Sequence, residues 1–133
     1  MSRQSQKTPL KWPLRLTHSQ SDGIAVVEVA GRIGHAASAT FSEALTQASR
    51  QAGNQLILDL GGVDYMSSSG LRVLGAAARS LSADGGALVL CHVSEPVRIA
   101  IELAGLLDTL AIEPSREEAA RRVKSSTAAR APE

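Results

Sequence analysis

The sequence predicts an α/β fold in one domain, with a mixed, mostly parallel sheet of about five strands and about four helices. Three observations carry this prediction. Strand-like and amphipathic helical segments alternate after an initial pair of strands, in the order β-β-α-β-α-β-α-β-α. Residues 56–60 are almost wholly apolar, which is typical of a strand covered on both faces. A length of 133 residues and a hydrophobic content of 44% suit a single core.

The first two strands are expected to form an antiparallel hairpin. Apolar residues alternate from Leu10 to Leu16, which predicts a half-buried strand. Pro13 cannot donate a ladder hydrogen bond, so this strand is expected at a sheet edge. Turn residues 19–23 lead into a more central, valine-rich strand over 24–30. We expect flexible tails at residues 1–9 and 124–133 around a domain spanning 10–123.

The remaining elements alternate between helix and strand. Gly31–Ser38 is interpreted as a loop, and Thr40 with Glu43 has capping-box spacing for a first helix that closes near Gly53. The strand at 56–60 is followed by a second helix, with Leu71, Leu74, Ala78 and Leu81 on one face, ended by Asp84-Gly85-Gly86. The later elements are a strand at 87–91, a helix opened by Ser94 and Pro96 and stopped by Gly105, a strand at 110–112, and a helix from Ser115 and Glu118 to about Val123.

The composition argues against several classes of function. A net charge of +1 and an aromatic content of 2% do not favour a nucleic-acid-binding face. Cys91 is the single cysteine, so no internal disulfide is possible, and its apolar neighbours indicate a buried, inert thiol. No apolar run approaches the length of a membrane span, and the N-terminus lacks a signal-peptide core. We therefore expect a cytoplasmic protein without membrane insertion.

Signatures of catalysis are missing from the sequence. It contains neither a phosphate-binding loop of the form GxxxxGK[ST] nor a GxGxxG fingerprint. The histidines at 18, 35 and 92 show no spacing typical of metal ligands. Ser69-Gly70 lacks the glycine that precedes the serine of a nucleophile elbow. We expect no enzyme activity, no metal site and no cofactor.

Three consecutive serines, Ser67–Ser69, lie where the third strand gives way to the second helix. One serine can cap that helix, which leaves two hydroxyls to be explained. They are either small residues at a tight turn or a phosphorylation switch. A phosphate adds about −1.5 to −2 charges. The N-terminus of a helix tolerates an anion, whereas a docked partner protein need not.

The segment Leu56-Ile57-Leu58-Asp59-Leu60, followed by Val63-Asp64-Tyr65-Met66-Ser67-Ser68-Ser69-Gly70-Leu71-Arg72-Val73-Leu74, resembles the STAS domain family of bacterial anti-sigma factor antagonists. Gly31-Arg32-Ile33, Gly85-Gly86 and Leu103-Ala104-Gly105-Leu106 support the resemblance, which runs from about Leu10 to Val123. The fold order of the family matches the order predicted here.

The resemblance implies a regulator that works by partner switching. The unmodified protein would bind an anti-sigma factor, often itself a serine kinase, and a phosphatase would restore this state after phosphorylation. Laid on the family motif, the acceptor is Ser68, with Ser67 and Ser69 as alternatives. Ser67 replaces a frequent aspartate, and Gly34 stands where many members are acidic, so constitutive binding without modification is an open alternative.

The expected contact surface comprises the serine loop, the outer face of the second helix and the Gly31–Ala37 loop. Its residues are Gly34, His35, Ser67, Ser69, Gly70, Arg72 and Arg79. The two arginines are seven positions apart and so share a helical face. We expect a monomer or weak dimer. The alternatives are a non-switching STAS scaffold or accessory subunit of a stress-signalling or lipid-transport complex, and, third, a small enzyme.

Overall fold

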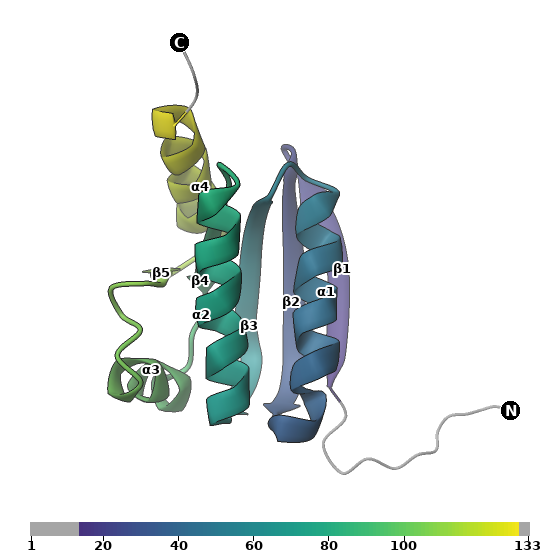
Figure 1. The fold of residues 1–133 in the computed structure, drawn as a ribbon, viewed down its shortest axis with the longest axis vertical. Coiled ribbons are helices and arrows are strands. Elements are labelled where there is room, and N and C mark those ends of the chain that lie inside the picture. The colour runs from purple at the N-terminus through teal and green to yellow at the C-terminus, as the bar shows by residue number, and fades with distance from the viewer. Residues whose placement is uncertain (1–13, 131–133) are drawn as a thin grey trace, which may run out of the picture.

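The computed structural model describes residues 14–130, and its order of strands and α-helices confirms the predicted ββαβαβαβα (Figure 1). The elements are β1 (Arg15–Ser21), β2 (Ile24–Ile33), a short 3-10 helix η2 (His35–Ala37), α1 (Ser38–Arg50), β3 (Gln55–Met66), α2 (Ser68–Ala83), β4 (Ala87–Cys91), α3 (Glu95–Leu103), β5 (Ala111–Glu113) and α4 (Arg116–Arg130). The predicted tail at 1–9, the strand residues 10–13 and the last residues 131–133 lie outside the described part of the chain.

The five strands form one sheet in the order β1-β2-β3-β4-β5. The first pair is antiparallel and the other three pairs are parallel, which confirms the predicted hairpin and mixed sheet. β1 lies at the edge, where the sequence placed it. Parallel strands put their carboxyl ends at the same edge of the sheet, so the segments that follow β2, β3 and β4 gather there.

Helices cover both faces of the sheet. α1 and α2 lie side by side on one face, while α4 covers the other (Figure 1). The side chains of β4 alternate accordingly, because Leu88 and Leu90 belong to the larger core under α1 and α2, whereas Val89 and Cys91 face α4. Each fully buried leucine or isoleucine contributes about 1.5–3 kcal/mol.

β2 and β3 run further than the sequence predicted. The predicted strand ends at Leu60, whereas β3 continues to Met66 and pairs with the end of β2 through two irregularities, as far as Ile33 opposite Met66. The Gly31–Ser38 loop is accordingly wrong in part, since it contains the end of β2 and the η2 turn. Buried backbone N–H and C=O groups need hydrogen-bond partners. The extended ends of β2 and β3 provide these partners for each other. The extension also brings the end of β2 against the start of α2.

The ends of two helices differ from prediction. α1 begins at Ser38 after Ala37, which makes no side-chain cap, so the capping box of Thr40 and Glu43 is wrong. The η2 turn leads directly into the helix, and the Ser38 hydroxyl donates to the His35 carbonyl at 2.8 Å. α4 does start with the predicted Ser115 cap, because the Glu118 amide donates to Ser115 Oγ at 3.2 Å. It then continues to Arg130, where a polar tail was expected beyond Val123.

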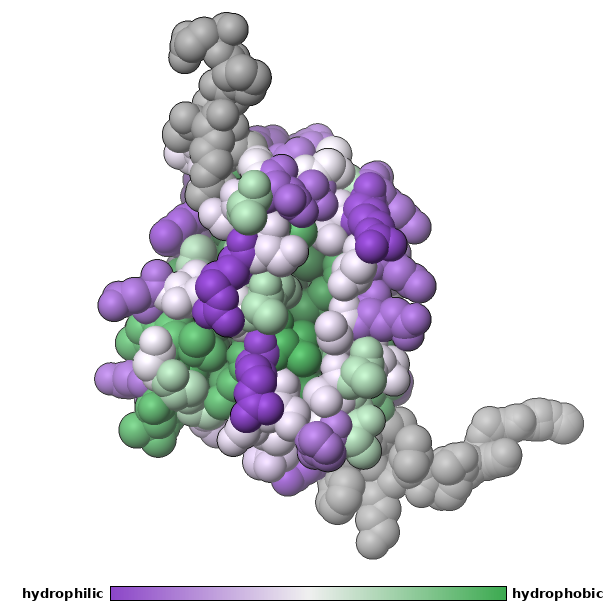
Figure 2. Space-filling model, viewed as in Figure 1, coloured by the Kyte–Doolittle hydropathy of each residue, from purple (hydrophilic) through white to green (hydrophobic). Residues whose placement is uncertain are grey.

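The surface over α1 and α2 is mainly polar, with apolar surface gathered over α3 and in the furrow between the two helices (Figure 2). No helix within residues 14–130 is both long and apolar enough to cross a membrane.

Candidate functional site

The serine loop is held at the carboxyl edge of the sheet by backbone and cap hydrogen bonds. The Ser67 amide donates to the Ile33 carbonyl at 2.8 Å, which ties the start of α2 to the end of β2. Ser67 is the N-cap of α2, and its hydroxyl accepts from the Gly70 amide at 3.2 Å. Aspartate and serine are both good N-caps, so the serine here can keep the helix start without the negative charge that an aspartate would bring.

The three serines occupy three different environments. Ser67 is half-buried and engaged as the cap. The Ser69 hydroxyl lies 2.6 Å from the Nδ1 atom of His35. Ser68, the first residue of α2, is exposed, and its hydroxyl has no side-chain hydrogen bond within the described part of the chain. Of the three, Ser68 therefore offers the hydroxyl that an external enzyme reaches without breaking a bond of the fold.

Gly70 has a packing role. A Cβ atom there would lie 2.7 Å from Met66 Cγ and 2.9 Å from Ile33 Cγ2, closer than carbon atoms approach. Gly70 is buried in this packing, and its expected place in a partner contact stays a prediction. The glycine lets α2 begin in contact with the ends of β2 and β3.

The loop after β2 lies beside the serine loop, as expected. Besides the bond between His35 and Ser69, the Ala37 amide donates to the Gly34 carbonyl at 3.2 Å, which closes the η2 turn. His35 is exposed and Gly34 is half-buried. The shared surface of the two loops is therefore available to a partner.

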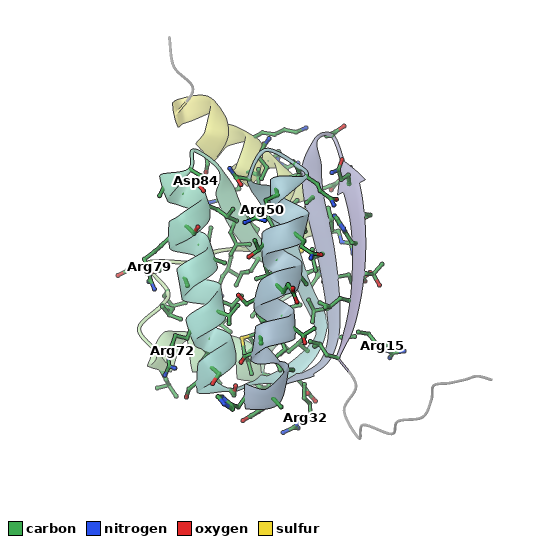
Figure 3. The ribbon with its side chains drawn as sticks, turned by 45° about the vertical axis from the view of Figure 1, so that its right-hand side comes forward. Arg15, Arg32, Arg50, Arg72, Arg79 and Asp84 are labelled. Carbon is green, nitrogen blue, oxygen red and sulfur yellow. The ribbon has the colours of Figure 1, made fainter. Side chains whose placement is uncertain are left out.

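Arg72 and Arg79 are both exposed on α2 and project from its side away from α1 (Figure 3). This arrangement confirms the shared face predicted from their spacing. Together with Ser68 they line a groove of about 260 Å³ between α2 and the segment after α3. The serine loop and the two arginines thus form one continuous surface.

Comparison with known proteins gives the family. The STAS domain family model matches residues 16–119. The chain belongs to the STAS domain family. It is 33% identical over 113 residues to a protein of Bordetella bronchiseptica named "Putative anti-sigma factor antagonist BtrV", covering 85% of this chain and 97% of the relative.

Solved structures of other proteins share the STAS fold. An anti-sigma factor antagonist from Mycobacterium paratuberculosis superposes with a TM-score of 0.76 at 24% identity, covering 84% of this chain and 95% of the other. The phosphorylated form of the Bacillus cell fate determinant SpoIIAA gives a TM-score of 0.61 at 24% identity, covering 84% and 99%. Anti-sigma factor antagonists are non-catalytic regulators, in agreement with the predicted lack of enzyme activity.

A second polar cluster of this STAS domain lies on the α4 side of the sheet. The buried Asp59 carboxylate accepts from the Gly61 amide at 2.9 Å and from Arg116 Nε at 2.9 Å, and it lies 3.1 Å from His92 Nδ1. Burial raises the pKa of Asp59, but these hydrogen bonds outweigh it and hold the pKa below its usual value. Arg116 opens α4, so this cluster attaches that helix to β3.

Ligand atoms of Asp59, Cys91 and His92 lie within 4.8 Å of one another. The carboxylate is already satisfied by its donors, and burial raises the pKa of the Cys91 thiol to about 11, so the thiolate that metals bind is disfavoured. The cluster therefore fits a structural role, and the predicted burial of the Cys91 thiol is confirmed. Sequence reasoning missed this cluster, although a single carboxylate inside the apolar run 56–60 was its visible signal.

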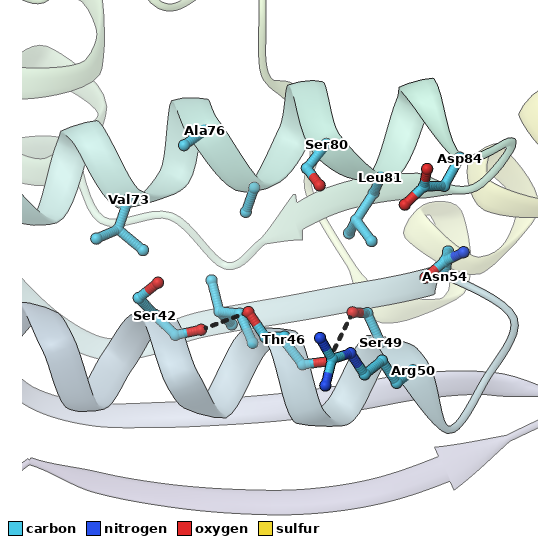
Figure 4. Close-up of a pocket in the computed structure, with 12 residues that line it drawn as sticks. Ser42, Thr46, Ser49, Arg50, Asn54, Val73, Ala76, Ser80, Leu81 and Asp84 are labelled. Carbon is cyan, nitrogen blue, oxygen red and sulfur yellow. Dashed lines mark hydrogen bonds between the residues drawn. The ribbon is translucent and has the colours of Figure 1, made fainter.

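A third feature is the furrow between α1 and α2, about 260 Å³ in volume and lined by small polar side chains together with apolar ones such as Val73 and Leu81 (Figure 4). Thr46 Oγ1 donates to the Ser42 carbonyl at 3.1 Å, and Ser49 Oγ donates to the Thr46 carbonyl at 3.0 Å. These hydroxyl protons are used within α1. The furrow is explained by close packing of two helices through small residues.

Proposed function

We propose that this STAS protein is a cytoplasmic anti-sigma factor antagonist that acts by partner switching. With Ser68 unmodified it binds an anti-sigma factor that is also a serine kinase, and phosphorylation of Ser68 releases that partner. A phosphatase then restores the binding form. The observation that carries the proposal is the exposed, unengaged Ser68 hydroxyl between Ser67, which caps the helix, and Ser69, which binds His35.

The fold can accept a phosphate at this position. Ser68 is the first residue of α2, where the helix carries partial positive charge and its first amides lack partners within the helix. An anion near such a terminus is stabilised by about 0.3–1 kcal/mol. Modification would therefore leave the domain folded and change only its surface.

The same phosphate would weaken the binding of a docked partner. New negative charge buried at an interface, or placed against a like charge, costs several kcal/mol, and about 1.4 kcal/mol corresponds to a tenfold change in affinity. The Bacillus protein SpoIIAA, which shares this fold, has been solved in a phosphorylated form. That precedent supports a modified state of the present chain.

The test is phosphorylation by purified anti-sigma factor kinases of the source bacterium in the presence of ATP, followed by intact-mass analysis. We expect the addition of one phosphate to the wild-type chain and to Ser69→Ala, and none to Ser68→Ala. The Ser69→Ala control keeps the cap and the acceptor while changing a neighbouring hydroxyl. If the chain binds one of these kinases yet gains no phosphate from any of them, the switch is wrong, and the protein is a STAS scaffold that binds constitutively.

A further inference from the structure

The groove between α2 and the segment after α3 has a cationic wall. It is lined by Ser68, Arg72, Gly75 and Arg79 of α2 and by Ala104 and Leu106 on the other side. A Cβ atom at Gly75 would lie 3.3 Å from Leu106 Cδ2 and 3.5 Å from a guanidinium nitrogen of Arg79. The glycine therefore keeps the groove open under the Arg79 side chain.

The two arginines carry uncompensated charge. Among the described residues, the ion pairs of arginine involve Arg116, Arg121 and Arg122, and none involves Arg72 or Arg79. Both project from the same side of α2 (Figure 3). Guanidinium groups bind carboxylates and phosphates through paired, charge-assisted hydrogen bonds. The groove thus matches an anionic group.

An apolar surface borders this cationic wall. Of the four large hydrophobic side chains exposed in the described part of the chain, three lie on α3 or just after it: Ile99 at 45%, Leu103 at 82% and Leu107 at 38%. Single exposed leucines are common, but a cluster beside a groove is typical of an interaction site. Figure 2 shows apolar surface over α3 next to the polar side chains of α2.

We infer that this groove binds an acidic, amphipathic segment of the anti-sigma factor and that a phosphate on Ser68 displaces the segment by pairing with Arg72. The inference rests on the proposed function. Carboxylates of the partner would pair with Arg72 and Arg79, while its apolar side chains would cover Leu103. The partner's chemistry follows from the two unpaired cations beside exposed leucine.

Phosphorylation then acts through competition inside the groove. Ser68 and Arg72 are four residues apart, one helical turn, and line the same groove. A phosphate of about −1.5 to −2 charges can form a charge-assisted pair with that guanidinium. The phosphate would occupy the site of the partner's carboxylate and repel that carboxylate by its negative charge.

The first test needs no partner and no kinase. Phosphoserine is incorporated at position 68 during translation, and the phosphate is titrated by ³¹P NMR in a His35→Gln background, which removes the nearby imidazole. We expect a lower midpoint for the phosphate in the presence of Arg72 than in Arg72→Ala. The control Arg98→Ala, on α3 outside the groove lining, keeps the lower midpoint. Equal midpoints with and without Arg72 would overturn the inference, even if the kinase test succeeds.

The second test uses an anti-sigma factor that binds in the kinase experiment. We expect Arg72→Glu, Arg79→Glu and Leu103→Asp each to weaken binding about tenfold or more, while Arg98→Ala binds as the wild type does. Wild-type affinity in all three variants would overturn the inference and leave the Ser68 switch intact. Self-association of the free chain that is abolished by Leu103→Asp would assign the face to a second copy and also overturn it.

Discussion

The Nδ1 atom of His35 and the hydroxyl oxygen of Ser69 lie 2.6 Å apart, which joins the η2 turn to the first turn of α2. This bond occupies one of the two hydroxyls that the helix cap leaves over. It accounts for the difference between Ser68 and Ser69, which neighbour each other in sequence but differ in exposure and in partners. We therefore predict that selection of the phosphorylated serine depends on a residue from another loop.

Replacing His35 is expected to broaden the choice of acceptor. In His35→Ala, Ser69 loses its partner, so the kinase should place phosphate on Ser69 as well as on Ser68. Peptide mapping by mass spectrometry measures the distribution. His18→Ala, which removes an exposed histidine of β1, serves as control and should leave the phosphate on Ser68 alone. An unchanged distribution in His35→Ala would show that the hydrogen bond does not select the site.

The close packing at Gly70 predicts a marked effect on stability. Gly70→Ala should lower the free energy of unfolding by about 1–3 kcal/mol, because the new methyl group overlaps Met66 and Ile33. Gly34→Ala is the matched control, since a Cβ atom there meets nothing within 4 Å and its φ of −92° suits any residue. Urea denaturation compares the two. Equal stability of both variants would contradict the packing role.

The cap of α2 can be tested separately from the acceptor. Ser67→Ala should lower the free energy of unfolding by about 0.5–2 kcal/mol, whereas Ser67→Asp should hold it near the wild-type value. Ser68→Ala, beside the cap, should have a smaller effect than Ser67→Ala because its hydroxyl makes no bond to the fold. Thermal unfolding of the three variants measures the order. A larger loss of stability in Ser68→Ala than in Ser67→Ala would show that Ser67 is not the residue that caps α2.

The Asp59 cluster predicts stability that is lost in acid. The pKa of Asp59 is lowered in the fold relative to about 3.9 in an unfolded chain. At pH values between the folded and the unfolded pKa, the unfolded state therefore binds more protons than the folded state. The contribution is complete above pH 4 or so and declines as the pH falls through the lower, folded pKa. Asp59→Asn should lose about 1–3 kcal/mol at neutral pH and show a flatter acid limb.

Glu113→Gln provides the comparison for that variant. Glu113 pairs with Arg122 at 2.8 Å, but the arginine is 49% exposed, so removal of this pair should cost about 1 kcal/mol or less. Denaturant titrations at several pH values give both results. An acid limb of Asp59→Asn that matches the wild type would show that other carboxylates govern acid unfolding.

Much of the fold follows from local patterns in the sequence. A short continuous apolar run is typical of a strand covered on both faces, so β4 begins and ends where the apolar run Ala87–Cys91 indicated, and all of its residues are buried. The position of β1 at the edge agreed with Pro13, a local property of the chain. The exposure of Ser68 could be expected from its position at the junction between β3 and α2.

Other features depend on contacts between distant segments. The extension of β3 to Met66 needs the end of β2 as its ladder partner, and α1 starts early because η2 leads into it. The bond between His35 and Ser69 joins residues 34 positions apart, which no local pattern reports. The exposure of Leu103 beside the arginines likewise could not be predicted from the sequence, because a leucine on an amphipathic helix is ordinarily expected to be buried.

The most direct measurement of the central claim is the affinity of one purified anti-sigma factor for three forms of this chain: unmodified, phosphorylated on Ser68, and Ser68→Ala. Isothermal titration calorimetry, with circular dichroism to verify folding, gives the comparison. We predict that the unmodified chain and Ser68→Ala bind equally and that the phosphorylated chain, still folded, binds at least about tenfold more weakly, a difference of about 1.4 kcal/mol. Equal affinity of the folded phosphorylated and unmodified forms would contradict the switch.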